Sequence, residues 1–157
     1  MSSRKLRVHI ENTRARPEIH HLTAERWSAA CARHRALGRR LEATIGWDGE
    51  ILEDALKTAN IVIGIGSRLE RLAVRAPRLK WLHTTLAGVD TFFPLDWLPQ
   101  DVIFTNNRGA HGAKAEQFVR MALTMLNSRM PEILANQRAH HWQQVFSSSI
   151  AGKTALI

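Results

Sequence analysis

The sequence predicts an α/β fold in which a parallel sheet carries helices on both faces. Segments with strand-like apolar patterns take turns along the chain with segments whose apolar residues recur at helical spacing. One of the strand-like segments, "NIVIGIG", is an unbroken apolar run, which is typical of parallel strands covered on both faces. With 157 residues and 45% apolar composition, the chain can bury a core of ordinary size.

The N-terminal part supplies one strand and one helix. Leu6, Val8 and Ile10 alternate with charged or polar residues, which indicates a strand with one covered face. Thr23 is a suitable N-cap, and an apolar stripe at helical spacing follows it as far as Leu41. This stripe predicts the first helix.

The middle of the chain continues the alternation. A short strand is expected near residues 43–47, before a helix in "DGEILEDALKTA", residues 48–59, whose early acidic residues suit a helix N-terminus. The unbroken apolar run "NIVIGIG", residues 60–66, predicts a central strand. A helix is expected over residues 67–77, where Pro77 ends it.

The last part supplies two more strands and a long helix. "LKWLHTTLA", residues 79–87, predicts another buried strand, and "DVIFTNN", residues 101–107, a fifth. Residues 111–129 predict a helix that is apolar nearly all round and therefore needs cover on every side. A further helix is expected to end near Trp142, and "GKTALI", residues 152–157, predicts the beginning of a strand.

Composition excludes several classes of protein. No apolar run reaches the ~18 residues of a membrane span, and "MSSRKLRVHI" carries charges where a signal peptide would be apolar. We therefore expect a cytoplasmic protein without membrane contact. The lone Cys31 cannot form an internal disulfide, and its place on the apolar side of a helix indicates packing.

The net charge of +8 raises the question of nucleic-acid binding. Residues 1–40 hold ten Lys and Arg against three Asp and Glu, whereas the remaining 117 residues hold twelve against eleven. The local excess recurs at helical spacing, which usually marks a solvated face. No aromatic residues alternate with these arginines as stacking platforms, so no nucleic-acid partner is expected.

Two glycine-containing turns follow predicted strands. Gly64 and Gly66 stand between a strand and a helix, as in a dinucleotide-binding turn, but Leu69 occupies the place of the third glycine. The simpler interpretation is a tight turn at the carboxyl edge of the sheet, where ligands of open α/β sheets gather.

The second turn is "TTLAGVD", residues 84–90. Gly88 has no side chain to shield its backbone, so neighbouring N–H groups could converge on a carboxylate. The alternative is a tight turn that merely requires glycine, and the residues alone leave both interpretations open.

The histidines do not predict a metal site. The side chains of adjacent histidines point in different directions on a strand or a helix, so such a pair cannot chelate a metal as an i, i+4 pair does. The chain has two adjacent pairs, His20-His21 and His140-His141. His83 in a predicted strand and His111 at the start of the long helix could titrate near neutrality.

Four ordered segments carry a family resemblance. "LKWLHTTLAGVD", "VIFTNNRGAHGAKAEQFVRMALTMLNSRM", "QRAHHWQQ" and "IAGKTALI" resemble successive segments of D-isomer-specific 2-hydroxyacid dehydrogenases. The resemblance implies a flavodoxin-like substrate domain over residues 1–104. The first helices and first strand of an NAD(P)-binding Rossmann domain would then occupy residues 105–157, with a hinge at Thr105 to Gly109.

The resemblance also implies a substrate site. Ala87, Gly88 and Val89 match the family's loop whose backbone amides hold the substrate carboxylate, and Gly66 and Ser67 match a neighbouring loop at the same cleft. The implied substrate is a small 2-hydroxy or 2-oxo acid.

On the cofactor side, the resemblance matches Asn106 and Asn107 to the segment that crosses between the domains, and Glu116 to the start of the long helix. That helix, residues 111–129, would supply the contacts between the two copies of a homodimer. The implied cofactor is NAD or NADP. The family's glycine-rich loop and catalytic residues would follow Ile157, so the resemblance implies no catalytic residue in this chain and no activity for it alone.

We therefore expect the N-terminal part of an NAD(P)-dependent oxidoreductase acting on the CH–OH group of a 2-hydroxy acid. The alternative is a stand-alone flavodoxin-like binding or regulatory module without catalysis, whose long apolar helix pairs with a partner. Flavin binding is a weak form of this alternative, because "ENTRARPE" after the first strand contains no glycine for a phosphate loop.

Overall fold

The computed structural model describes residues 5–64 and 75–156. The chain divides into two compact units, Met1–Gly109 and Ala110–Ile157, and each is described by itself. The domain boundary predicted between residues 104 and 105 from the family resemblance stays a prediction.

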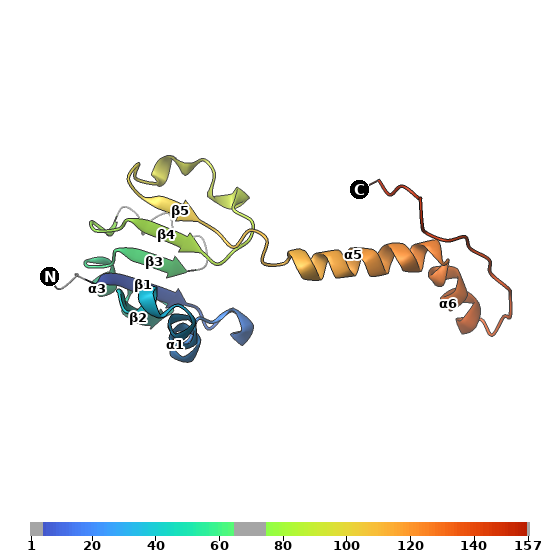
Figure 1. The fold of residues 1–157 in the computed structure, drawn as a ribbon, viewed down its shortest axis with the longest axis horizontal. Helices are drawn as coiled ribbons and strands as arrows, with labels where there is room; N and C mark the ends of the chain where they lie inside the picture. The colour runs from blue at the N-terminus through green and yellow to red at the C-terminus, as the bar shows by residue number, and fades with distance from the viewer. Residues whose placement is uncertain (1–4, 65–74, 157) are drawn as a thin grey trace. The chain divides into compact units, whose positions relative to one another are not determined.

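The first unit is built on one five-stranded sheet (Figure 1). Every pair of neighbouring strands is parallel, and the order is β2-β1-β3-β4-β5. This is the order of flavodoxin-like doubly wound sheets. The predicted parallel sheet and the central place of the apolar strand β3 are thus confirmed. The strands are β1 (Leu6–Asn12), β2 (Leu41–Trp47), β3 (Ile61–Gly64), β4 (Trp81–Thr84) and β5 (Ile103–Thr105).

Short helices connect the strands. The Thr23 hydroxyl accepts a hydrogen bond from Arg26 N, which confirms the predicted N-cap. The helix predicted over residues 67–77 lies almost wholly outside the described residues. The α-helices of this unit are α1 (Ala24–Arg33), α2 (Arg35–Gly38) and α3 (Leu52–Leu56), and 3-10 turns span Glu18–His20, Asp90–Phe92 and Leu95–Trp97.

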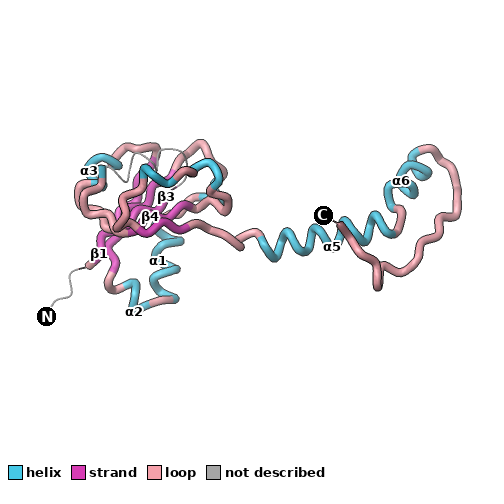
Figure 2. Tube along the Cα trace, turned by 90° about the horizontal axis from the view of Figure 1, so that it is seen from above, coloured by secondary structure: helices cyan, strands magenta, loops and turns pink. Residues whose placement is uncertain are grey.

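Helices cover both faces of the sheet, as Figure 2 shows for α1 and α3. Successive strand residues point to opposite faces, so Ile61 and Val62 belong to different clusters of the core. Ile61 packs in the cluster that includes Trp27 of α1, whereas Val62 packs in the cluster that includes Leu56 of α3. The second cluster also contains Leu82, which is fully buried and anchors β4.

The second unit contains α5 (Gly112–Asn127) and α6 (Met130–Arg138). The long helix predicted at residues 111–129 is confirmed as α5. Helix α6 ends at Arg138, earlier than the predicted Trp142, because His140 adopts a left-handed conformation (φ 51°) that ends the helix.

The strand expected over residues 152–157 is not formed in the described residues, and this expectation is wrong. Residues 153–156 have no regular secondary structure. An extended segment becomes a strand only when a neighbouring strand takes up its backbone hydrogen bonds, and the only sheet among the described residues is complete without it. None of the described helices combines the length and the apolar character that crossing a membrane would require.

Candidate functional site

Two segments that follow neighbouring strands lie together at one edge of the sheet. The β4 loop, residues 85–89, follows β4, and the β5 segment, residues 106–109, follows β5. Because β3, β4 and β5 are parallel and adjacent, both segments leave the sheet at the same edge. Ligands of open parallel sheets bind at this edge.

Two asparagines of the β5 segment hold three consecutive carbonyl groups of the β4 loop. Asn107 Nδ2 donates to Thr85 O at 3.1 Å, and Asn107 N donates to Leu86 O at 2.9 Å. Asn106 Nδ2 donates to Ala87 O at 2.7 Å. The carbonyl groups of Thr85, Leu86 and Ala87 therefore point toward the β5 segment.

This arrangement fixes the direction of the amide groups. In a trans peptide the N–H points opposite to the C=O of the preceding residue, so the N–H groups of Ala87 and Gly88 face away from the asparagines. Leu86 N donates to the Thr84 hydroxyl at 3.3 Å. Among the described residues, no hydrogen bond is made by the N–H groups of Ala87, Gly88 or Val89. The loop thus presents a short row of donors that have no partner in the part of the chain described here.

Gly88 lies in the middle of this row and is exposed. Its φ lies outside the left-handed range, and a Cβ added to it would meet only Asp90 Oδ2, at an ordinary 3.5 Å. The turn therefore does not need glycine for its conformation or for space. The interpretation of this turn as a carboxylate site stays a prediction.

A second hydrogen-bond network lies behind the loop, on β4 and β5. Trp81 Nε1 donates to Thr105 Oγ1 at 2.7 Å, and Thr105 Oγ1 lies 2.8 Å from His83 Nδ1. His83 Nε2 lies 3.2 Å from Asn107 Oδ1. Burial lowers the pKa of His83 below its ordinary value, and the hydrogen bond to Asn107 opposes this effect. His83 is therefore neutral at pH 7.

The predicted cofactor residues are all engaged within the chain. Asn106 and Asn107 use their side-chain donors on the β4 loop. Glu116, in the second unit, forms an ion pair with Arg120 one turn further along α5, at 2.7 Å. Their assignment to a cofactor stays a prediction, and so does the assignment of Ala87, Gly88 and Val89 to the substrate. The predicted substrate residues Gly66 and Ser67 lie outside the described residues.

Sequence analysis missed Trp81 and Thr105 and noticed His83 only as a titratable residue. A signal was available, because Trp81 and His83 lie two residues apart on one strand and so share a face. The pairing of His83 with Thr105 across the sheet depends on the strand register, which the sequence does not display.

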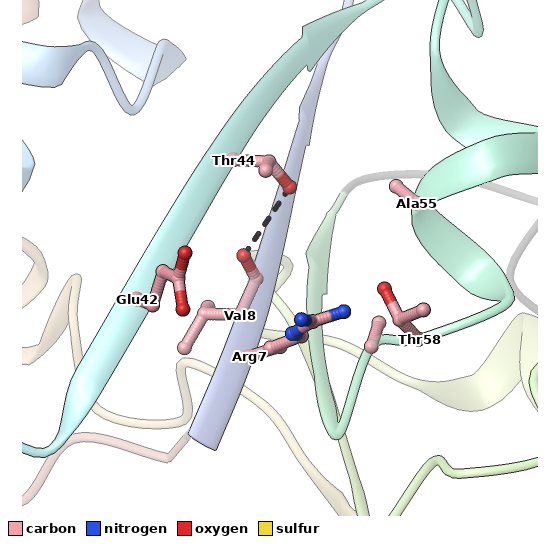
Figure 3. Close-up of a pocket in the computed structure, with 7 residues that line it drawn as sticks. Arg7, Val8, Glu42, Thr44, Ala55 and Thr58 are labelled. Atoms are coloured by element: carbon pink, nitrogen blue, oxygen red, sulfur yellow. Dashed lines mark hydrogen bonds between the residues drawn. The ribbon is translucent and has the colours of Figure 1, made fainter. Parts of the chain in front are cut away.

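A pocket of about 290 Å³ lies elsewhere, beside β1 and β2 (Figure 3). Arg7 and Glu42 face each other in the strand register near the beginnings of these strands, and Thr44 donates to Val8 O at 3.4 Å. The pocket is lined by Arg7, Val8, Glu42, Thr44, Ala55, Thr58 and Ala59. It contains none of the residues of the β4 loop.

Comparison with known proteins finds similarity in structure only. No family model and no curated protein matches the sequence. The crystal structure of a D-isomer specific 2-hydroxyacid dehydrogenase family protein from Aeromonas salmonicida subsp. salmonicida A449 is similar over 95% of this chain, with a TM-score of 0.66 and 20% sequence identity. A phosphoglycerate oxidoreductase from Vibrio cholerae o395 matches 88% of this chain and 42% of its own, with 20% identity and a TM-score of 0.45.

The chain spans 44% of the length of the Aeromonas protein. At 20% identity, the likeness is one of fold. The fold resemblance predicted from the four sequence segments is thus confirmed, and the chain has an α/β fold similar to part of a 2-hydroxyacid dehydrogenase.

Proposed function

We propose that this chain forms the substrate-binding part of an NAD(P)-dependent 2-hydroxyacid dehydrogenase. In this proposal the β4 loop holds the carboxylate of a small 2-oxo or 2-hydroxy acid through the backbone N–H groups of Ala87, Gly88 and Val89. The observation that carries the proposal is the set of three carbonyl groups held toward the β5 segment, which turns the N–H groups of Ala87 and Gly88 to the opposite side, where they have no partner among the described residues.

A carboxylate suits such a row of donors. Hydrogen bonds from backbone N–H groups to an ionised oxygen are shorter and stronger than those to a neutral one. Because the β5 segment already holds the loop, little conformational entropy is lost when the acid binds. Asp90 acts in the opposite direction, since its carboxylate lies close to Gly88 and repels an anion. Gly66 and Ser67 would lie at the same cleft in this proposal.

The cofactor of the proposed enzyme is NAD or NADP, which supplies the hydride when it is bound. The three residues assigned to it do not fit direct contact in the conformation described here. Asn106 and Asn107 hold the β4 loop, and Glu116 pairs with Arg120. In this proposal Asn106 and Asn107 shape the substrate loop, and no step of the reaction follows from any of the three residues.

We also infer that two copies of the chain associate through α5. Phe118, Met121 and Met125 recur at spacings of three and four residues, which places them on one face of the helix. They are 63%, 49% and 38% exposed, so the rest of the second unit does not cover them. An apolar face of this kind is typical of a surface that another chain covers.

The test of substrate binding is a titration of the ¹⁵N-labelled chain with glyoxylate or pyruvate, followed by amide chemical shifts. We expect the largest shifts at Ala87, Gly88 and Val89. Methyl pyruvate has the same carbonyl but no ionised carboxylate, and it should produce much smaller shifts. Equal responses to the acid and the ester, or shifts confined to residues outside the β4 loop, would contradict the proposal.

A further inference from the structure

We propose that His83, acting through Asn107, sets the orientation of the β4 loop. It is thus a positioning residue for the carboxylate grip, the backbone N–H groups of the β4 loop that hold the acid in the proposed function. This inference rests on the proposed function and extends it to a side chain that does not belong to the grip. The observations that support it are the hydrogen-bond network of β4 and β5 and the chemistry of each donor and acceptor in it.

Donor and acceptor chemistry fixes the hydrogen bonds at both ends of this network. The Trp81 indole N–H can only donate, so the Thr105 hydroxyl accepts from it and has its own hydrogen free for His83 Nδ1. At the other end, Asn107 Nδ2 donates to the carbonyl of Thr85, so the Asn107 oxygen faces His83. An amide oxygen only accepts, and His83 Nε2 must therefore carry the hydrogen. For a neutral ring, the arrangement that satisfies all the groups has His83 protonated on Nε2.

His83 decides which way the Asn107 amide points. The two ends of an asparagine amide are almost equal in size and opposite in hydrogen-bonding character. If Nε2 did not donate to the Asn107 oxygen, the amide could rotate by half a turn and place its oxygen against the Thr85 carbonyl. Two acceptors would then face each other, and the Thr85 carbonyl would lose its donor.

The Thr85 carbonyl is the first of the three that orient the loop. Asn107 N still donates to Leu86 O in such a rotated state, so the β5 segment stays attached. The loss is therefore a local one that changes the peptide planes leading to Ala87. This separates a positioning role from a role in folding, because the effect is expected in the loop and not in the core.

The position of His83 agrees with this role. It is half-buried on β4, on the face of the sheet opposite to the fully buried Leu82. Its two ring nitrogens are both used within the network. A neutral ring matches the single set of donors and acceptors, and burial favours the neutral form.

The experiment uses the full chain labelled with ¹⁵N and requires first the ring nitrogen shifts of His83 in the wild type. We expect the pattern of a neutral ring with hydrogen on Nε2 at pH 7. A ring with hydrogen on Nδ1, or a charged ring, would overturn the proposal without any substitution. This measurement also does not depend on whether a 2-oxo acid binds.

Variants then test the connection to the loop. His83→Leu removes the donor, whereas His83→Gln keeps an N–H donor on a side chain of suitable length. In His83→Leu we expect faster hydrogen exchange and altered amide shifts at residues 86–89, with glyoxylate binding about fivefold to tenfold weaker. His83→Gln should recover most of the affinity. The matched control is His111→Gln, an exposed histidine in the second unit that should change neither.

Asn107→Asp keeps the oxygen that faces His83 but replaces the donor to Thr85 O with a second acceptor. The amide chemical shifts of the loop should therefore change as they do in His83→Leu. Unchanged loop amides in both folded variants would overturn the proposal. If His83→Leu does not fold, the ring shifts and the Asn107→Asp variant still decide the matter. A further outcome is that the wild type binds no 2-oxo acid while the loop amide shifts still change in His83→Leu and Asn107→Asp. In that case the proposed function fails and the positioning role of His83 stands.

Discussion

In the proposed site, a glycine at position 88 leaves the neighbouring backbone N–H groups accessible. Its backbone conformation is one that any residue adopts, and a Cβ there would meet a single side-chain oxygen at an ordinary contact distance. The three carbonyls beside it are held by two asparagines, so the N–H groups are presented to the other side. In the proposed site, Gly88 therefore serves access to the backbone and not the path of the chain.

Gly88→Ala should therefore leave the fold intact and weaken carboxylate binding. A methyl group beside the donors hinders the approach of the acid, and losing one charge-assisted hydrogen bond lowers affinity by about tenfold or more. The measurement is a titration with glyoxylate together with a denaturation curve. Gly109→Ala is the matched control, because Gly109 has φ +88° and alanine there costs about 1 kcal/mol of stability. Its binding should not change, and weaker stability in Gly88→Ala with unchanged binding would contradict our interpretation.

The lowered pKa of His83 predicts a direction for stability against pH. The ring resists protonation in the folded chain, whereas in the unfolded chain it titrates near its ordinary value of 6.5. The unfolded state therefore binds more protons below that pH, and the contribution of neutral His83 to stability is complete above pH 6.5 and is lost as the pH falls through and below it.

Urea denaturation at pH 7.5 and pH 5.5 measures this effect. The loss of stability on acidification should be smaller in His83→Gln than in the wild type, because glutamine does not titrate. The other histidines are the same in both proteins, so the difference between the two losses reports on His83. Identical losses would mean that the folded ring has its ordinary pKa.

At the scale of the element, α5 exposes an apolar stripe that the rest of its own unit does not cover. Its polar side carries the Glu116 and Arg120 pair, while Phe118, Met121 and Met125 form an exposed apolar stripe. Water in contact with such a stripe makes association favourable.

Phe118→Lys should reduce the association of the chain, because a charge in the middle of the stripe opposes its burial. Sedimentation velocity over a range of protein concentrations measures this. Arg120→Ala is the control on the same helix, since an exposed pair of this kind contributes only about 0.3–0.5 kcal/mol and lies off the stripe. A wild type that is monomeric at all concentrations would show that α5 does not pair with a second copy.

At the scale of the whole molecule, the sheet of the first unit is what brings the candidate site together. The site contains residues from β4, from β5 and from the segments that follow them, and the parallel pairing of these strands places them at one edge. Leu82 anchors β4 in the core from the face opposite to His83. The stability of this core therefore sets the fraction of molecules in which the site exists.

Leu82→Ala should lower the free energy of unfolding by about 2–5 kcal/mol, because it removes fully buried atoms and leaves a cavity. Chemical denaturation measures the change. Leu37→Ala is a suitable control, since Leu37 is 59% exposed and its truncation should cost much less. Equal effects of the two substitutions would contradict the position of Leu82 in the core.

Much of the first unit could be predicted because its signals are local. The apolar run at residues 60–66 reflects the burial of one strand on both faces. The alternation at Val8 and Ile10 correctly predicted strand β1, but its second face is covered as well, since His9 is fully buried. The candidate loop could be found in the same way, because Gly88 stands at the end of an apolar strand. Segment boundaries were less accurate, as the early end of α6 after Arg138 shows, because a single backbone conformation at His140 ends that helix.

The order of apolar and polar residues by itself determined an α/β unit with parallel strands and a glycine-containing loop at the end of β4. Burial on one or two faces of an element produces a periodic pattern of apolar residues, and this pattern can be recognised in the sequence. Only the tertiary structure decided that Asn106 and Asn107 hold that loop and that His83 meets Thr105. It also decided that residues 153–156 form no strand. These outcomes depend on strand register and on hydrogen bonds between segments far apart in the chain, and such pairings leave no periodic pattern in either segment.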